Sequence, residues 1–196
     1  LSLFGVLSLE DVHINILLAG SSMKETVLRR PLEQLVDYGL LVGRKNSYQV
    51  RHALVHSYIR ECLPVGDDAV LRIAKFYVTY IQQRWEYRRD RFSTLAKQQA
   101  HIVEVMSVCV TRKMWDVVTG LVFVINESLS DGCQWIDPKV VLALGLIAAN
   151  EKQAHKDEKR WLLALTVLIG TQHDAKSTTE LSRKLVLTYL GQQGTS

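Results

Sequence analysis

The chain has 196 residues, which is enough for one compact domain or for two small ones. Hydrophobic residues make up 47% of the chain and charged residues 22%, a composition that excludes global disorder. The formal net charge of +4 favours only a weak attraction to polyanions. The longest apolar run, from Trp161 to Ile169, is too short to span a bilayer, so we expect no membrane association.

The cysteines and the first residues indicate where the protein works. Cys62, Cys109 and Cys133 are far apart and fit no metal or redox spacing. Each lies in or beside an apolar helical run, which predicts buried free thiols in a reducing compartment. No signal peptide is recognised, so we expect a cytoplasmic protein. The sequence begins with Leu1 rather than Met, in a segment that resembles the end of a helix, so we expect a fragment of a longer chain.

The first thirty residues predict a succession of short helices. Residues 1–4 end at Gly5 as the last turn of a helix would. Ser8 can cap a second helix that carries Val12 inward and ends at Gly20. Ser21 or Ser22 begins a third helix, which leads to Pro31.

Residues 31–50 predict a helix followed by a hairpin. Pro31 suits the first turn of a helix, where no backbone N–H is needed, and Gly39 suits the left-handed position that closes it. Residues 40–42 and 48–50 are short strand-like runs, separated by a hairpin loop at residues 43–47.

Another helix is predicted directly after the hairpin. Its apolar positions form one stripe, namely Leu54, Val55, Tyr58, Ile59 and Cys62. Three helices, a β-hairpin wing and a further helix are typical of a winged-helix domain. We assign this domain to residues 1–64, because the Leu63-Pro64-Val65-Gly66 segment has the composition of a boundary.

A winged helix often binds DNA, but the charges here are nearly balanced. Residues 1–63 carry seven basic and six acidic side chains, and the helix that would enter the groove contains Glu33 and Asp37. A helix that faces phosphates should be clearly basic. The candidate DNA-binding residues are Arg29, Arg30, Arg44 and Lys45. A DNA-binding transcriptional regulator with a helical sensor domain is therefore the alternative hypothesis.

The runs LEQLVDYGLL and SYQVRHALVHSYIRECL resemble the winged helix of the STAND signal-transduction ATPases, the NB-ARC proteins. In that family the helix after the wing opens with a Met-His-Asp-type motif, whose histidine contacts the phosphates of bound ADP in the closed form. The matching triplet is Arg51-His52-Ala53, which keeps only the histidine. The resemblance implies that His52 senses ADP held by an upstream nucleotide-binding domain of the same chain.

The chemistry of His52 fits this role, since an imidazole at a helix start can donate a hydrogen bond to a phosphate oxygen. The alternative is an ordinary histidine on a polar helix face, which it shares with His56 and Arg60 at i, i+4 and i+8. Two histidines at i, i+4 without a third ligand do not indicate a metal site, so we expect no metal.

Residues 65–196 predict helices only. Six apolar stripes at helical spacing begin near Val70, Leu95, Trp115, Val140, Trp161 and Leu181. Pairing of residues 115–129 with 140–148, and of 161–169 with 181–190, suggests stacked helix–turn–helix units similar to tetratricopeptide repeats. The STAND resemblance extends to this helical arm and implies that it binds a protein partner or a ligand.

No motif for catalysis is present. A Walker sequence, a G-x-S-x-G elbow and an HExxH motif are all missing, so we expect a fragment without enzymatic activity of its own, in a parent protein that is an ATPase. The arginine-rich run at residues 84–91 could contact nucleic acid or an acidic partner, or could be a solvated helix end. A third hypothesis is a plain protein-interaction scaffold, in which the winged helix is a passive cap.

Overall fold

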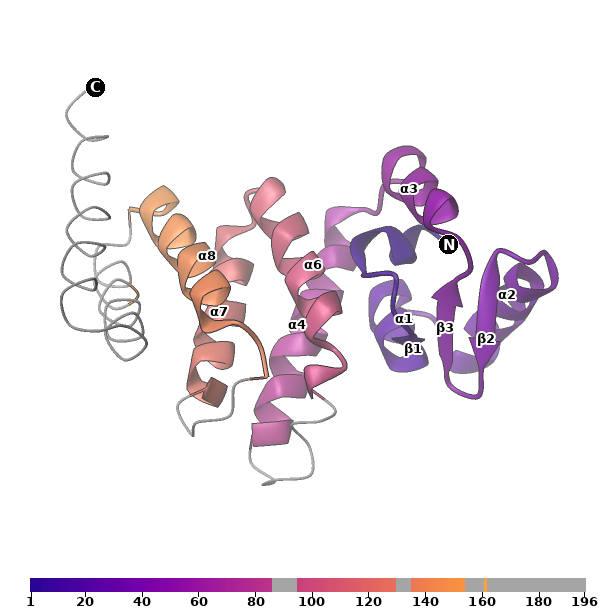
Figure 1. Ribbon diagram of the computed structural model, residues 1–196, viewed down its shortest axis with the longest axis horizontal. Coiled ribbons are helices and arrows are strands. Elements are labelled where there is room, and N and C mark those ends of the chain that lie inside the picture. Colours follow the sequence, from indigo (N-terminus) through magenta and orange to yellow (C-terminus); the bar gives the residue numbers. More distant parts are fainter. Residues whose placement is uncertain (86–94, 130–134, 154–160, 162–196) are drawn as a thin grey trace. The chain divides into compact units, whose positions relative to one another are not determined.

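The computed structural model describes residues 1–85, 95–129, 135–153 and Trp161, and the chain divides into two compact units, Leu1–Ile136 and Asp137–Ser196. The described part is mainly helical and contains one small, three-stranded antiparallel sheet (Figure 1). The prediction of a mainly α fold with a β-hairpin is therefore confirmed. The finer winged-helix and tetratricopeptide-like interpretations, and the domain boundary between residues 64 and 65, stay predictions.

The first unit opens with the 3-10 helix η1 (Ser2–Val6), the strand β1 (Val12–His13) and the helix α1 (Ile14–Ser21). The predicted helix over residues 8–20 therefore begins too early. Val12 is in a strand because it pairs with Tyr48 of the hairpin. His13 is the N-cap residue of α1, and its Nδ1 accepts a hydrogen bond from the Asn15 backbone N–H at 3.2 Å.

Helix α2 runs without interruption from Glu25 to Asp37, so the prediction of a separate helix beginning at Pro31 is wrong. Proline inside a helix removes the N–H that would bond to the carbonyl four residues earlier, here that of Val27. Val27 and Pro31 are both exposed, so this carbonyl lies where water can reach it. The predicted end at Gly39 is confirmed, since that residue has a φ of +71°.

The end of α2 is a Schellman motif. The Gly39 N–H donates to the Val36 carbonyl at 2.9 Å, and the Leu40 N–H donates to the Leu35 carbonyl at 3.0 Å. These two bonds satisfy carbonyls that the last helical turn leaves without partners, and they direct the chain into the hairpin.

The predicted hairpin is confirmed, with longer strands and a shorter turn than expected. Strand β2 (Leu41–Arg44) pairs with β3 (Ser47–Val50) across a turn at residues 45–46, and β1 adds on the other side of β3, so the strand order is β1-β3-β2. Leu41 and Val50 face each other and are both buried, which joins the hairpin to the core.

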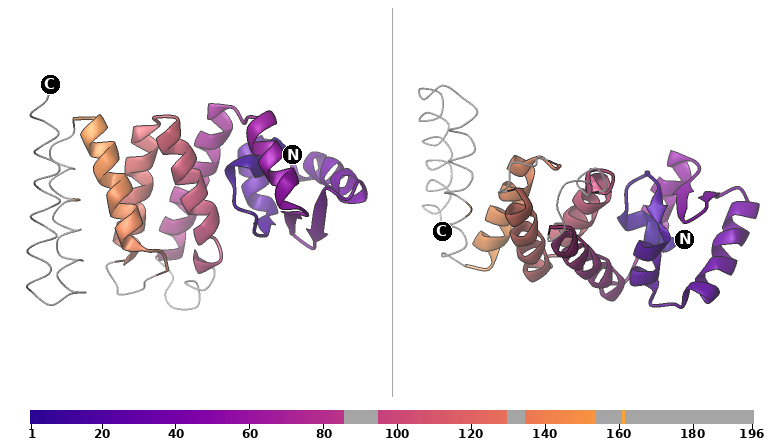
Figure 2. Two further views of the ribbon diagram at one scale, coloured as in Figure 1. Left: turned by 45° about the horizontal axis from the view of Figure 1, so that its top comes forward. Right: turned by 90° about the horizontal axis from the view of Figure 1, so that it is seen from below.

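Helix α3 (Ala53–Cys62) follows the hairpin and packs against η1. Three further helices follow among the described residues of the first unit: α4 (Asp67–Trp85), α6 (Gln99–Thr111) and α7 (Trp115–Leu129). Each of these three contacts the other two, and they lie side by side in Figure 2. Helix α4 also packs against α1, and α6 against η1, so two elements that precede the hairpin contact these helices.

The core of the helical part follows the predicted stripes closely. The predicted positions that are buried in α4, α6 and α7 are Val70, Ala74, Tyr77, Ile81, Ile102, Met106, Cys109, Val118, Leu121, Val122 and Ile125. Burial raises the pKa of the Cys109 thiol to about 11, so that this cysteine is a protonated core residue, as predicted. Cys62 is exposed, which contradicts the prediction for that residue.

In the second unit the structure describes helix α8 (Pro138–Glu151). The Asp137 carboxylate caps this helix by accepting from the Lys139 N–H at 2.9 Å, and Pro138 occupies the first turn. The predicted pairing of residues 115–129 with 140–148 stays a prediction. Cys133, the arginine-rich run after Trp85 and the predicted helices beyond Trp161 lie outside the described residues.

Candidate functional site

Helix α3 is oriented differently from the sequence prediction. Leu54 is 84% exposed and Tyr58 is 58% exposed, although both were expected to lie on the buried stripe. The buried residues of this helix are His56 and Ile59. The predicted inward stripe is therefore confirmed at Ile59 and wrong at Leu54, Tyr58 and Cys62, and a face with a histidine and an arginine packs against the rest of the unit.

His56 explains this orientation. Its Nε2 lies 3.0 Å from the Phe4 carbonyl oxygen and 2.9 Å from the Leu7 carbonyl oxygen, at the end of η1. Because both oxygens can only accept, Nε2 carries the hydrogen and donates to the pair. Carbonyl groups at the end of a short 3-10 helix lack helical partners and need a hydrogen-bond donor. The buried imidazole supplies this donor, which apolar carbon atoms in the same place could not do.

The next residue on the same face, Arg60, forms an ion pair with Glu104 of α6 at 2.9 Å. The face that the sequence analysis described as polar therefore connects α3 to η1 through His56 and to α6 through Arg60. Within the described ranges there is no group of three or more His, Cys, Asp or Glu side chains that could hold a metal ion.

His52 lies one turn before His56, at the N-cap position of α3, and it is exposed. Its side chain makes no capping hydrogen bond, and the first turn of α3 contains no acidic residue. The first backbone N–H groups of a helix have no partner within the helix, and the helix dipole makes this end positive. The backbone N–H of the preceding residue, Arg51, donates to the Leu40 carbonyl at 3.0 Å, which fixes the chain entering α3.

The N-terminal end of α3 thus combines an exposed imidazole, an exposed guanidinium at Arg51 and free backbone donors. All three groups attract an anion. The arrangement can bind a phosphate through charge and hydrogen bonds. His52 is exposed in the structure, and its assignment as an ADP sensor stays a prediction.

The four candidate DNA-binding residues differ in their availability. Arg29 donates from Nε to the Glu25 carboxylate at 2.8 Å, and Arg44 forms an ion pair with Asp11. Arg30 and Lys45 are exposed and make no ion pair within the part of the chain that the structure describes. Two of the four cations are therefore neutralised by neighbouring carboxylates.

A second structural histidine, His101 of α6, is fully buried and was not predicted from the sequence. Its Nδ1 accepts from the Ser8 N–H at 3.1 Å and lies 2.8 Å from Ser8 Oγ, and its Nε2 donates to the Asp11 carbonyl at 3.2 Å. Burial lowers the pKa of His101, more than nearby carboxylates raise it. A polar residue at a core position of an apolar stripe was the available signal for this role.

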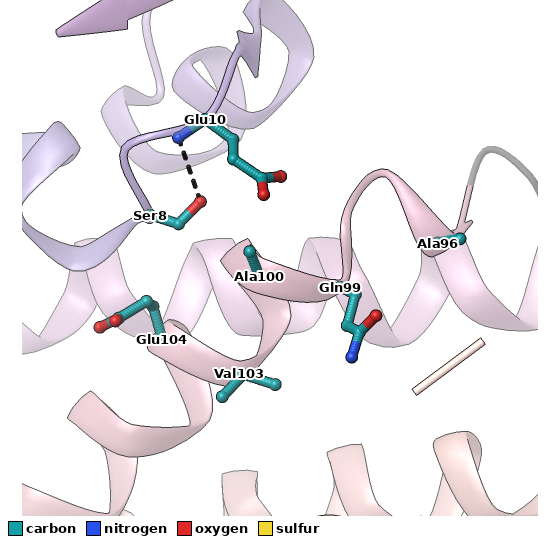
Figure 3. A pocket seen from close by; sticks show the side chains of 7 residues that line it. All are labelled: Ser8, Glu10, Ala96, Gln99, Ala100, Val103 and Glu104. Carbon is teal, nitrogen blue, oxygen red and sulfur yellow. Dashed lines mark hydrogen bonds between the residues drawn. The ribbon is translucent and has the colours of Figure 1, made fainter. Parts of the chain in front are cut away.

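Beside His101 the surface has a hollow of about 450 Å³, lined by the loop that precedes β1 and by the start of α6 (Figure 3). Its lining residues are Ser8, Glu10, Ala96, Gln99, Ala100, Val103 and Glu104. The charged residues that line this hollow are Glu10 and Glu104, of which Glu104 is paired with Arg60, and the lining offers no cation to a phosphate. The hollow is therefore not a suitable place for a nucleotide, and the N-terminus of α3 is the better anion site.

No family model, curated protein or solved structure matches this chain. In the described helices we find none that is both long enough and apolar enough to cross a membrane.

Proposed function

We propose that this chain is the regulatory part of a nucleotide-controlled signalling switch of the STAND, or NB-ARC, type. In this proposal β1, α1, α2, the β2–β3 hairpin and α3 form a winged helix, which closes over ADP held by a nucleotide-binding domain elsewhere in the parent protein. The order of helices and strands and the β1-β3-β2 sheet order support the winged-helix interpretation.

The observation that carries the proposal is the uncapped N-terminal end of α3. His52 is exposed at a helix N-terminus that has no side-chain cap, and Arg51 precedes it. In a switch of this kind, a phosphate of ADP would take the place of the missing cap. The nucleotide would thereby stabilise the closed position of the winged helix, and its loss would favour the open one.

The long helices serve in this proposal as a scaffold or sensor arm. Helices α4, α6 and α7 pack around a continuous apolar core, which suits an α-helical repeat array similar to tetratricopeptide repeats. A protein partner or a ligand bound to the arm would favour the open form of the switch. The chain itself performs no catalysis in this proposal, and ATP hydrolysis belongs to the nucleotide-binding domain.

Calorimetry of ADP binding tests the proposal, with a longer protein that includes the nucleotide-binding domain. The variant His52→Ala should bind ADP at least about tenfold more weakly, the loss of one charge-assisted hydrogen bond. Lys75→Ala removes an exposed cation from α4 and is the matched control, with unchanged affinity expected. Equal affinity of wild type and His52→Ala would refute the assignment.

A DNA-binding regulator is the alternative, and one contact favours it. Arg29 Nη2 lies 3.3 Å from Asn46 Oδ1, so α2 and the hairpin turn bring their cations to the same end of the module. Fluorescence anisotropy with a DNA duplex at low and high salt tests this hypothesis. Binding that falls steeply with salt, and that is lost in an Arg30→Ala/Lys45→Ala variant, would favour the DNA-binding regulator.

A further inference from the structure

Helix α2 lies at the periphery of the first unit. Of its 13 residues only Leu28 and Leu32 are buried, and its principal neighbour is strand β2. In the views of Figures 1 and 2 it lies beside the hairpin, at the edge of that unit. Most of its surface is therefore available to a partner molecule.

The side chains on the outer face of α2 form one seam. Val27 is 57% exposed, Arg30, Gln34 and Asp37 are exposed, and Tyr38, directly after the helix, is 77% exposed. The first four follow one another at intervals of three, four and three residues, which is the spacing of the contact positions between two packed helices. An apolar residue lies at each end of the seam, and polar residues lie between them.

The charges of α2 are arranged against its own helix dipole. Lys24 and Arg30 lie in the N-terminal half and Glu33 and Asp37 in the C-terminal half, while the pair Glu25–Arg29 is neutral in sum. Positive charge near the N-terminus and negative charge near the C-terminus destabilise an isolated helix. This distribution does not stabilise α2 alone, but it makes the helix complementary to an antiparallel copy of itself.

We propose that the outer face of α2 is a dimerisation surface, which binds the same face of a second copy of this chain about a two-fold axis. With the axis between Glu33 and Gln34, Arg30 of each copy lies opposite Asp37 of the partner subunit, and Val27 lies on the same side of the axis as Tyr38 of the partner subunit. Each contact occurs twice, as an isologous interface requires. The two Gln34 side chains face each other at the centre, where amides can donate and accept.

The occupant is a second copy because the surface is self-complementary. A partner helix of one charge sign would leave one half of α2 facing a like charge, whereas the antiparallel copy pairs both halves. This surface shares no residue with the N-terminus of α3, so the inference does not depend on nucleotide binding.

Sedimentation velocity and light scattering of the full chain, over a wide range of protein concentration, test the proposal. Arg30→Glu and Asp37→Arg each replace two attractive pairs by two repulsive ones, and each should weaken dimerisation by at least about tenfold. The double variant Arg30→Glu/Asp37→Arg restores opposite charges and should restore the dimer. Lys75→Glu makes the same charge reversal on α4 and should leave dimerisation unchanged.

Circular dichroism of each variant checks that the fold is kept, which is expected because the altered side chains are exposed. A chain that stays monomeric at every concentration would overturn the proposal. A dimer that both single variants leave intact would overturn it as well, since its interface would then lie elsewhere. Failure of the double variant to recover dimerisation would refute the antiparallel pairing of Arg30 with Asp37.

Discussion

Substitution of His56 by alanine is the sharpest test of how α3 is held in place. The change removes a buried imidazole and the donor to two carbonyl groups of the η1 segment. The Phe4 carbonyl keeps one partner, the Leu7 N–H at 3.2 Å, whereas the Leu7 carbonyl keeps none among the described residues. One buried acceptor without a partner costs about 1–3 kcal/mol, and the lost packing adds about 1 kcal/mol. We expect the free energy of unfolding to fall by about 2–4 kcal/mol.

The measurement is urea unfolding followed by far-UV circular dichroism. All four tryptophans follow residue 84, so their fluorescence does not report on α3 directly. His52→Ala is the matched control: the same residue type one turn earlier, exposed and without a capping bond, whose loss should change the free energy of unfolding by less than about 0.5 kcal/mol. If the two variants lose equal stability, or if His56→Ala loses none, the anchoring role of His56 is wrong.

Three other predictions concern pH, packing and the end of α2. Burial lowers the pKa of His101 in the folded state, so below about pH 6.5 the unfolded chain binds a proton that the folded chain excludes. The free energy of unfolding should therefore fall as the pH is lowered through this range, and a His101→Gln variant should show a smaller fall in urea titrations at two pH values. Ile59→Ala should cost about 2–5 kcal/mol and Leu54→Ala less than about 0.5 kcal/mol, because only the isoleucine is buried; equal losses would contradict the orientation of α3. Gly39→Ala should lower the free energy of unfolding, measured by urea titration, by about 1 kcal/mol, since the φ of +71° at this position strains any residue with a Cβ atom. An added Cβ meets no atom within 4 Å there, so Gly39→Asn should recover part of this loss.

Local patterns predicted the elements that depend on neighbouring residues. The hairpin, the closing Gly39 and the core stripes of α4 and α7 all follow from turn chemistry and helical spacing. Strand β1 was missed because its two residues have no strand signal of their own. They become a strand only through pairing with Tyr48 and Ser47, which are more than thirty residues away.

The errors at α3 have a related cause. Hydrophobicity alone favours burial of Leu54 and Tyr58, but it takes no account of the backbone groups against which the helix packs. The Leu7 carbonyl after η1 needs a donor, and His56 is the residue of α3 that provides one, to this oxygen and to that of Phe4. The position of His52 at the start of α3 was easier to predict, because it depends only on where the helix begins.

His56 anchors α3, whereas His52 is the residue that we propose binds phosphate, and one experiment can distinguish these two roles. His56 holds the helix to η1, and the half-exposed Arg60–Glu104 pair adds at most about 1 kcal/mol to its attachment to α6. His52 extends from the free end of the same helix. If a phosphate binds at His52, a displacement of α3 is transmitted to η1 through the buried imidazole of His56, four residues further along the chain. A folded His56 variant should therefore keep its affinity for ADP but lose the coupling between nucleotide and the helical arm, whereas a His52 variant should lose the affinity itself.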